Sequence, residues 1–232
     1  MLEVRDLHAG YGLSTVLDGV DLDVGDGEFV AVLGRNGMGK TTLCRAIMGL
    51  DPPVVTGGSI SYDGTELTGM QPHKVARAGL GYVPQGRHVF PTLDVVKNLT
   101  VAARGEGWTV DRVWEAFPRL EERRGNDAGL LSGGEQQMLA IARALMTNPR
   151  MLIMDEPSEG LAPIMIDAVA EQLQRLKESS IGLLLVEQNY SLAIRLADVV
   201  YVLENGQVVF RGSAEDLDAE EEVKHRYLGV GV

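Results

Sequence analysis

The sequence predicts an α/β fold, in which buried parallel strands alternate with helices. Two observations support this prediction: continuous apolar runs are typical of strands buried on both faces, and segments with helical periodicity lie between them. The runs are Phe29–Leu33, Met151–Met154 and Gly182–Val186. A length of 232 residues suits one such domain with a smaller subdomain appended. We therefore expect residues 1–232 to form a single domain.

The first half of the chain contains short strands, turns and one helix. In Val20–Val24 apolar residues alternate with acids, which is typical of a half-exposed strand. A glycine-rich segment follows Phe29–Leu33, and a helix is expected after it at Lys40–Gly49. Two more strands are expected at Ser59–Tyr62, which precedes an Asp-Gly turn, and at Leu80–Val83.

Between residues 88 and 148 strand patterns give way to helical ones. Asp111–Leu120, for example, places Val113, Trp114 and Phe117 on one side and predicts a single helix. We expect residues 88–148 to form a helical subdomain inserted in the α/β core.

The last third of the chain returns to alternating strands and helices. Ile164–Glu178 has the spacing of an amphipathic helix. Asn205-Gly206 separates two short apolar runs, Tyr201–Leu203 and Val208–Phe210, and predicts a hairpin. The acidic segment Glu215–Tyr227 is expected to be helical.

The composition argues against several classes of function. Lys+Arg 21 against Asp+Glu 33 gives a net charge of −12, which disfavours nucleic acid as a partner because no basic patch offsets it. No apolar run approaches the roughly 20 residues of a membrane helix, and residues 1–10 lack the apolar core of a signal peptide. Cys44 is the single cysteine and the four histidines are scattered, so no zinc site is expected. We expect a cytoplasmic protein.

A glycine-rich loop carries the first chemical signal. Residues 34–41 match G-x-x-x-x-G-K-[ST] between a predicted strand and a predicted helix. In such a loop backbone N–H groups cradle phosphate oxygens, Lys40 reaches the β- and γ-phosphates, and the Thr41 hydroxyl holds Mg²⁺. A glycine-rich turn could meet the pattern by chance, and the loop alone does not separate a kinase, a GTPase and a transport motor. The candidate nucleotide-binding residues are Gly34, Asn36, Gly37, Gly39, Lys40, Thr41 and Thr42.

A second candidate phosphate-binding element begins at Ser132. Ser132 with Glu135 fits a capping box at the start of a helix. A cap alone does not require Gly133 and Gly134, each of which costs about 1 kcal/mol of helix propensity relative to alanine. An anion that approaches the helix N-terminus closely explains the two glycines better.

Two carboxylates follow the apolar run at 151–154. In a parallel sheet the carboxyl end of a buried strand lies near the phosphate loop. Asp155 then suits the Mg²⁺ shell, and Glu156 suits the role of polarising the attacking water. The alternative is a pair of solvated acids at a strand end.

With these motifs the chain resembles the ABC transporter ATPases, and the segment from Leu131 to Gln137 resembles their signature sequence. The resemblance implies a P-loop NTPase of ABC type, with a mixed-sheet core related to RecA, an antiparallel β subdomain and a helical subdomain. It also implies ATP and Mg²⁺ as cofactors. It further implies that Ser132, Gly133 and Gly134 bind the γ-phosphate of ATP held by an opposite subunit, so that hydrolysis requires a dimer.

The same resemblance implies three further site residues. Tyr11 matches the aromatic residue that stacks on adenine, although a surface tyrosine is the alternative. Gln85 matches the glutamine that reaches Mg²⁺ and the water and reports to the transmembrane partner. Gln188 stands where most of the family has a histidine that contacts the γ-phosphate. Glutamine offers a neutral hydrogen bond there but carries no charge near pH 7.

Four segments resemble one branch in particular, the shorter ATPase of branched-chain amino-acid importers. This implies a second ATPase subunit in a homo- or heterodimer, permease subunits, indirect work with a solute-binding protein, and a peripheral place on the inner face of the cell membrane. A urea or short-amide importer is the close alternative, because the ATPases of those importers share the sequence Pro84–Arg87. The segments are Tyr82–Arg87, Glu156–Pro163, Val186–Asn189 and Tyr227–Gly229.

Three other functions are weighed against this interpretation of the sequence. A regulatory subunit that barely hydrolyses ATP is suggested by Gln188. An ABC ATPase of DNA repair or of the ribosome is disfavoured, because those usually carry coiled-coil insertions or two cassettes. A small-molecule kinase would leave the element at Ser132 without a task.

Overall fold

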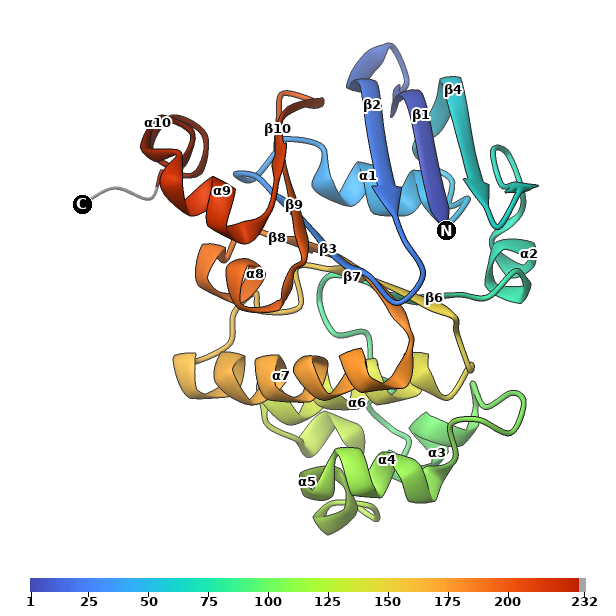
Figure 1. The fold of residues 1–232 in the computed structure, drawn as a ribbon. Coiled ribbons are helices and arrows are strands. Elements are labelled where there is room, and N and C mark those ends of the chain that lie inside the picture. The colour runs from blue at the N-terminus through green and yellow to red at the C-terminus, as the bar shows by residue number, and fades with distance from the viewer. Residues whose placement is uncertain (230–232) are drawn as a thin grey trace.

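A six-stranded sheet forms the centre of the computed structural model, which describes residues 1–229 (Figure 1). Its strand order is β10-β9-β3-β8-β7-β6; β10 runs antiparallel at one edge, and the other five strands are parallel. Every residue of β3, β7 and β8 is buried, as expected for strands covered on both faces. The strands are β3 (Phe29–Leu33), β6 (Leu80–Val83), β7 (Met151–Asp155), β8 (Gly182–Glu187), β9 (Val199–Glu204) and β10 (Gln207–Gly212).

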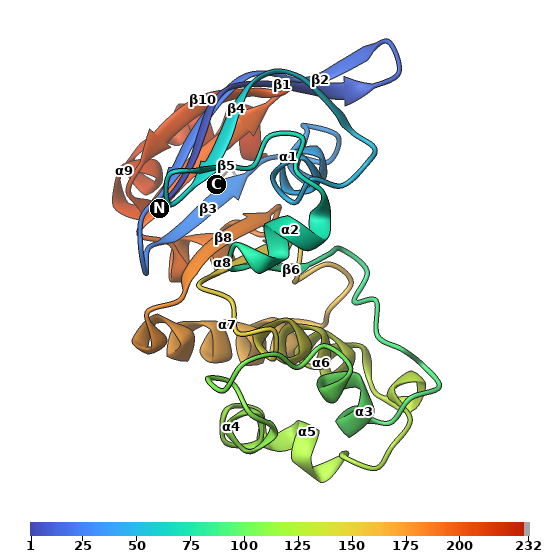
Figure 2. The ribbon, with the colours of Figure 1, turned by 90° about the vertical axis from the view of Figure 1, so that its right-hand side faces the viewer.

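A second sheet is antiparallel and has the order β2-β1-β4-β5. Helix α1 (Lys40–Ile47) lies between this sheet and the central one (Figure 2). Its buried side chains, among them Leu43, Cys44 and Ile47, share one apolar cluster with residues of both sheets. The strands are β1 (Leu2–Tyr11), β2 (Ser14–Val24), β4 (Val54–Tyr62) and β5 (Thr65–Glu66), and the short helix α2 (Pro72–Arg77) precedes β6.

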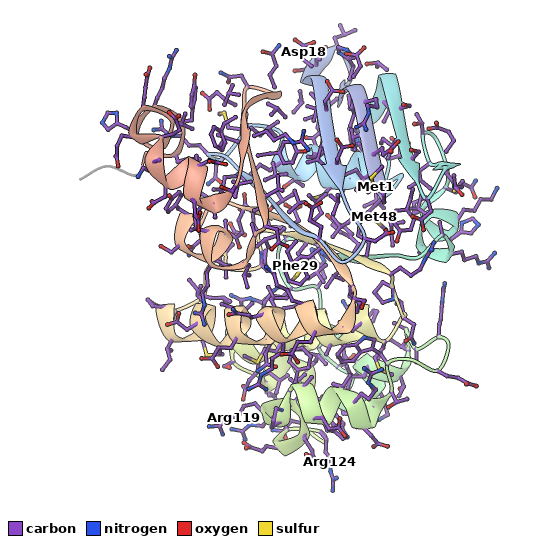
Figure 3. The ribbon with its side chains drawn as sticks, in the orientation of Figure 1. Met1, Asp18, Phe29, Met48, Arg119 and Arg124 are labelled. Carbon is purple, nitrogen blue, oxygen red and sulfur yellow. The ribbon has the colours of Figure 1, made fainter. Side chains whose placement is uncertain are left out.

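The other face of the central sheet is covered by helices (Figure 2). Helices α6 and α7 lie against the sheet, and α3, α4 and α5 lie beyond them. Phe29 lies in the interior with the cluster that these helices form, while Arg119 and Arg124 lie at the outer end (Figure 3). The helices are α3 (Val95–Thr100), α4 (Val110–Ala116), α5 (Pro118–Glu122), α6 (Gly133–Leu145) and α7 (Pro163–Leu176).

A third apolar cluster lies beside the hairpin of β9 and β10, which turns at Asn205-Gly206 as predicted. Helices α8 (Tyr190–Leu196), α9 (Ala214–Ala219) and α10 (Glu221–Val223) contribute to it. The tail is helical as predicted but is interrupted at Glu220, which has φ −91° and ψ 75°. Across the described residues no helix has the length and apolar character needed to span a membrane.

One helix prediction is wrong in part. Asp111–Leu120 is not a single helix, because α4 ends at Ala116 and α5 begins at Pro118. The residue before a proline is disfavoured in the helical region, and Phe117 has φ −128° and ψ 67°. Val113 and Phe117 still point into one core.

The register of the parallel strands places several loops side by side. Leu33 pairs with Glu187, Asp155 with Val186, and Val83 with Met154. The chain leaves all four strands at the same edge of the sheet, where ligands bind in open α/β folds. The segments that follow β3, β8, β7 and β6 therefore meet there, and each contains predicted site residues.

Candidate functional site

The loop between β3 and α1 has the backbone that the glycine-rich motif predicts. Gly37 and Gly39 have φ of 83° and 103°, conformations that other residues rarely adopt. At Gly34 a side chain is excluded by space, since an added Cβ would lie 2.5 Å from the carbonyl oxygen of Leu203. Helix α1 begins at Lys40, as predicted, and its N-terminus faces the loop.

A cavity of about 370 Å³ opens over this loop. Its wall combines backbone of the loop with the side chains of Lys40, Thr41 and Thr42 and, from two other strand ends, Gln85 and Glu156. A Cβ at Gly37 would meet nothing within 4 Å, so the cradle is open at this point. Loop N–H groups, a helix N-terminus and a buried lysine fit a chain of phosphates.

Lys40 is buried and fully engaged by groups of the chain itself. Its Nζ donates to the carbonyl oxygens of Gly34 at 2.7 Å and Arg35 at 2.8 Å. It also lies 2.8 Å from Oε1 of Glu156. The Lys40 and Glu156 side chains are only 3% and 8% exposed. A ligand phosphate that takes Lys40 must therefore displace a buried carboxylate.

Asp155 contacts the wall of this cavity through Thr41. Its Oδ1 accepts a hydrogen bond of 3.1 Å from the Thr41 hydroxyl, and its Oδ2 accepts one of 3.4 Å from the Tyr82 hydroxyl. Burial raises the pKa of Asp155 to about 6, the Thr41 hydrogen bond opposes this, and the nearby Glu156 adds to it. Burial likewise raises the pKa of Tyr82.

The oxygen atoms of Thr41 and Asp155, with Gln85 nearby, suit Mg²⁺. This ion prefers hard oxygen ligands and in phosphate sites takes only one or two from protein carboxylates. Within residues 1–229 no group of three or more His, Cys, Asp or Glu side chains could hold a metal by itself. The donor set therefore fits an ion held jointly with a nucleotide better than a self-sufficient metal site.

Gln85 and Gln188 reach the same region from opposite sides of Glu156. Gln85 Nε2 donates to Glu159 Oε2 at 2.9 Å and to Glu156 Oε2 at 3.4 Å. Glu156 has φ 47°, a left-handed backbone that is strained for glutamate. Exposed Gln188 lines a second cavity of about 340 Å³, whose wall also includes Asn36, Glu156 and Ser158. Because Asn36 and Glu156 line both cavities, the two are neighbours.

Tyr11 lies at the edge of this site. It is 38% exposed at the end of β1, and its hydroxyl oxygen lies 3.4 Å from Oγ1 of Thr42, which lines the first cavity. Tyr11 does not itself line that cavity. Its role as an adenine platform stays a prediction.

The second candidate phosphate-binding element lies apart from both cavities, since Ser132, Gly133 and Gly134 line neither. Ser132 caps α6 in a capping box: its Oγ accepts from Glu135 N at 3.3 Å, and its N donates to Glu135 Oε2 at 2.8 Å. A Cβ on Gly133 would lie 2.8 Å from Arg87 Nη1, and one on Gly134 would overlap Met165. The glycines thus also permit packing within the chain, a reason that the sequence did not reveal.

Comparison with known proteins identifies the class of site. The family model of the ABC transporter matches residues 17–159. The chain belongs to the ABC transporter family. It is 43% identical to the high-affinity branched-chain amino acid transport ATP-binding protein BraG of Pseudomonas aeruginosa, over 99% of this chain and all of that protein. It is 36% identical to the probable branched-chain amino acid transport ATP-binding protein LivF of Archaeoglobus fulgidus, over 99% of each.

Among solved structures, the ABC chain is similar to the dimeric structure of MJ0796, a bacterial ABC transporter cassette. The TM-score is 0.78 and the identity 26%, over 92% of this chain and 99% of that one. These matches confirm the predicted family, the predicted fold class and the predicted ATPase activity.

Two polar residues of this ABC subunit were not predicted as site residues. Arg87 donates to the carbonyl oxygen of Gly160 at 3.2 Å and lies beside Gly133. Glu187, the last residue of β8, is buried. It accepts hydrogen bonds from Ser158 and from the loop that directly follows Glu187. A charged residue that ends an apolar run was the one available signal for Glu187.

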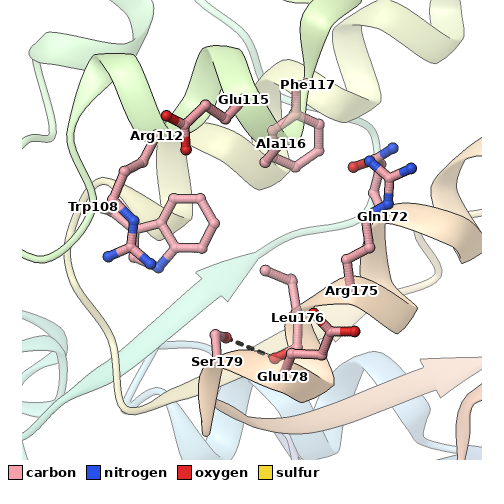
Figure 4. Close-up of a pocket in the computed structure, with 10 residues that line it drawn as sticks. All are labelled: Trp108, Arg112, Glu115, Ala116, Phe117, Gln172, Arg175, Leu176, Glu178 and Ser179. Carbon is pink, nitrogen blue, oxygen red and sulfur yellow. Dashed lines mark hydrogen bonds between the residues drawn. The ribbon is translucent and has the colours of Figure 1, made fainter.

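The ABC subunit has a further hollow of about 370 Å³ between α4 and the end of α7 (Figure 4). The guanidinium of Arg112 lies over the Trp108 ring, 5.0 Å from its centre, and Arg175, Glu115 and Glu178 complete a wall of mixed charge. None of the predicted site residues lines it. The hollow therefore adds nothing to the nucleotide site.

Proposed function

We propose that this chain is the ATP-hydrolysing subunit of an importer for branched-chain amino acids. The observation that carries the proposal is the 43% identity to BraG over practically the whole of both proteins. The proposed location is the inner face of the cell membrane, where permease subunits hold the chain.

ATP binds in the cavity over the phosphate loop in this proposal. The N–H groups of residues 34–41 surround the β- and γ-phosphates, and Lys40 moves its charge from Glu156 to them. Tyr11 stacks on the adenine, and Asn36 and Thr42 complete the wall. Thr41, Asp155 and Gln85 hold Mg²⁺, which neutralises negative charge on the phosphate oxygens when bound.

Release of Lys40 prepares Glu156 for hydrolysis. While paired with the ammonium at 2.8 Å, the Glu156 carboxylate cannot accept freely from a water. Once the phosphates have taken Lys40, Glu156 can orient and polarise the attacking water. Gln85, already 3.4 Å from Glu156, helps to hold that water, and Gln188 donates a neutral hydrogen bond to the γ-phosphate.

A second subunit completes the site. The capping box of α6 uses the N–H groups of Ser132 and Glu135. The N–H groups of Gly133 and Gly134 are not part of the capping box. We propose that these N–H groups, with the Ser132 hydroxyl, bind the γ-phosphate of ATP held by the opposite ATPase. The dimeric state of the similar MJ0796 cassette supports the pairing of two subunits that this arrangement requires.

The segment between β6 and β7 contains the proposed permease contact. We propose that residues 88–148 act as a helical subdomain and that Gly86–Asn98, just after Gln85, contacts the permease. A change in the hydrogen bonds of Gln85 to Glu156 and Glu159 then reports the state of the nucleotide to the membrane partner. The working complex also includes a second ATPase subunit, either another copy of this chain or a sister ATPase, and, indirectly, a solute-binding protein.

Solute uptake tests this function. Cells that lack the gene should lose uptake of labelled leucine, isoleucine and valine, and the wild-type gene should restore it. A gene with Glu156→Gln should fail to restore uptake, while one with Glu171→Gln, at an exposed position of α7, should succeed. Loss of labelled urea or acetamide uptake with normal leucine uptake would instead show the short-amide importer.

The second candidate function rests on Gln188. A subunit without a protonatable group at that position could serve as a regulator that binds ATP and barely hydrolyses it. ATPase activity of the transporter complex separates the two candidates, because a regulator would leave turnover unchanged when Glu156 is replaced by Gln.

A further inference from the structure

Glu187 is a buried carboxylate for which the proposed mechanism has no use. It is 1% exposed, and within residues 1–229 no Lys, Arg or His lies within ion-pair distance of it. Burial raises the pKa of its carboxyl group. A carboxylate so placed costs stability unless hydrogen bonds compensate it. The stability of this carboxylate therefore depends on hydrogen bonds from its neighbours, and these neighbours include Gln188, a predicted catalytic residue.

Four donors converge on the Glu187 carboxylate from two loops. From the loop after Glu156, the Ser158 N donates to Oε1 and the Ser158 hydroxyl to Oε2, both at 2.9 Å. From the loop after β8, the N–H groups of Gln188 and Asn189 donate to Oε2, both at 3.0 Å. Four donors match the acceptor capacity of an ionised carboxylate.

Each of the two loops carries a residue of the proposed reaction. The Ser158 loop follows Glu156 directly, and Glu156 N donates to the carbonyl oxygen of Val186 at 2.8 Å, which continues the β7–β8 pairing. The other loop carries Gln188, and its Asn189 caps α8 by accepting from Leu192 N at 3.0 Å. Glu156, Ser158, Glu187 and Gln188 all line the 340 Å³ cavity.

We propose that Glu187 is a positioning residue for ATP hydrolysis, because its carboxylate fixes the Ser158 loop and the Gln188 loop to each other. The inference rests on the proposed function and adds a residue to that site. A shift of either loop reaches the other through Glu187, so the Ser158 loop and the γ-phosphate donor Gln188 move together. Glu187 acts through the two loops that its hydrogen bonds join.

The hydrogen-bond pattern makes Glu187→Gln a sharp probe. The amide oxygen can take the place of Oε2 and keep three hydrogen bonds, while the amide NH₂ takes the place of Oε1. Two donors, the NH₂ and the Ser158 N–H, then face each other, so one of the two hydrogen bonds from Ser158 is lost and the link to the Ser158 loop is weakened. The Gln188 and Asn189 arms remain, so β8 and α8 should keep their fold.

The test uses the transporter complex recovered from membranes through a tag on this chain. We expect Glu187→Gln to lower kcat for ATP about tenfold, with the KM for ATP within about twofold because the phosphate loop is unchanged. Glu171→Gln on α7 is the matched control and should keep the wild-type kcat. Wild-type kcat in Glu187→Gln overturns the inference and leaves the proposed function standing. Absence of hydrolysis by the wild-type complex overturns both.

A mutant cycle between the two loops gives a readout that a merely structural role would not produce, and it also applies if Glu187→Gln fails to fold. No hydrogen bond in residues 1–229 joins Ser158 directly to Gln188, so Glu187 is their link. Ser158→Ala and Gln188→Ala should therefore be non-additive in kcat by about threefold or more. Strict additivity in wild-type Glu187 chains overturns the inference.

Discussion

The chain contains two proposed phosphate-binding elements, and they differ in the contacts that they make within the single subunit. The loop at 34–41 lies at the centre of the sheet edge, and its buried Lys40 is held by two carbonyl oxygens and Glu156. The N-terminus of α6 lies on the helical side, with Ser132 exposed and its side chain engaged in the capping box of α6. The loop at 34–41 must release Glu156 from Lys40 before Lys40 can bind phosphate. The N-terminus of α6 can bind phosphate without giving up an ion pair.

This difference divides the work between the two elements. In the proposed mechanism, exchange at Lys40 couples nucleotide binding to release of Glu156, so the loop should govern both affinity and the start of chemistry. In the proposed mechanism the α6 N-terminus supplies N–H groups to a γ-phosphate that another subunit holds, so it should govern turnover and not the affinity of a lone subunit. The substitutions below test this division, from the largest expected effect to the smallest.

Glu156→Gln should have the largest effect. The amide cannot polarise water as a carboxylate does, so kcat should fall about 10³-fold. Because a neutral amide competes less for Lys40, ATP should bind at least as tightly as in the wild type. Single-turnover hydrolysis and ATP titration measure both quantities, and weaker ATP binding would contradict the proposed exchange.

Lys40→Ala should weaken ATP binding about 100-fold, as loss of a charge-assisted contact to phosphate costs about 3 kcal/mol. Equilibrium binding of a fluorescent ATP analogue measures this loss. Lys74→Ala, at an exposed position of α2, is the matched control and should bind as the wild type does. Equal ATP binding by both variants would contradict the proposed role of the 34–41 loop in holding the nucleotide.

Asp155→Asn should stabilise the nucleotide-free chain at neutral pH. The pKa of Asp155 is raised to about 6 from 3.8. Its protonated form therefore stabilises the fold below about pH 4, and that contribution is lost as the pH rises through about 6. The gain from asparagine should be about 2 kcal/mol at pH 7.5 and smaller at pH 5. Denaturant unfolding at both pH values, with Asp111→Asn as control, measures it; an equal gain at both would refute the buried-carboxylate explanation.

Ser132→Ala should have the smallest effect on a lone subunit. Loss of the cap costs about 1 kcal/mol of stability, whereas ATP affinity measured at dilute, monomeric protein should stay within about twofold. Binding titration and thermal unfolding give the two values. A large loss of ATP affinity in the dilute subunit would show that Ser132 and Lys40 bind the same nucleotide within one chain, and would contradict the proposed separation of their roles.

The motifs at strand ends could be predicted because local rules set them. A buried strand followed by a glycine-rich loop or by carboxylates leaves few structural alternatives, and Lys40 does start a helix. Strand β1 was not predicted, because a bulge near Asp6, which has φ 46°, breaks the alternation between Val4 and Leu7.

The links between loops could not be predicted from local pattern. The Lys40–Glu156 pair joins residues from two strands, and the four hydrogen bonds of Glu187 depend on β7 and β8 being neighbours. The packing of Gly134 against Met165 likewise requires α6 to lie beside α7. Such contacts follow from strand order and helix packing, which the motifs do not specify.

Mixing two inactive variants tests most directly whether one triphosphate is shared by two chains. Lys40→Ala and Ser132→Arg subunits should each lack hydrolysis alone, the first through its loop and the second through the partner's site. In an equal mixture, each mixed dimer has one site built from an intact loop and an intact α6 N-terminus, so about a quarter of wild-type activity should return. No recovery in mixtures shown to contain mixed dimers, or full activity of either variant alone, would contradict the account.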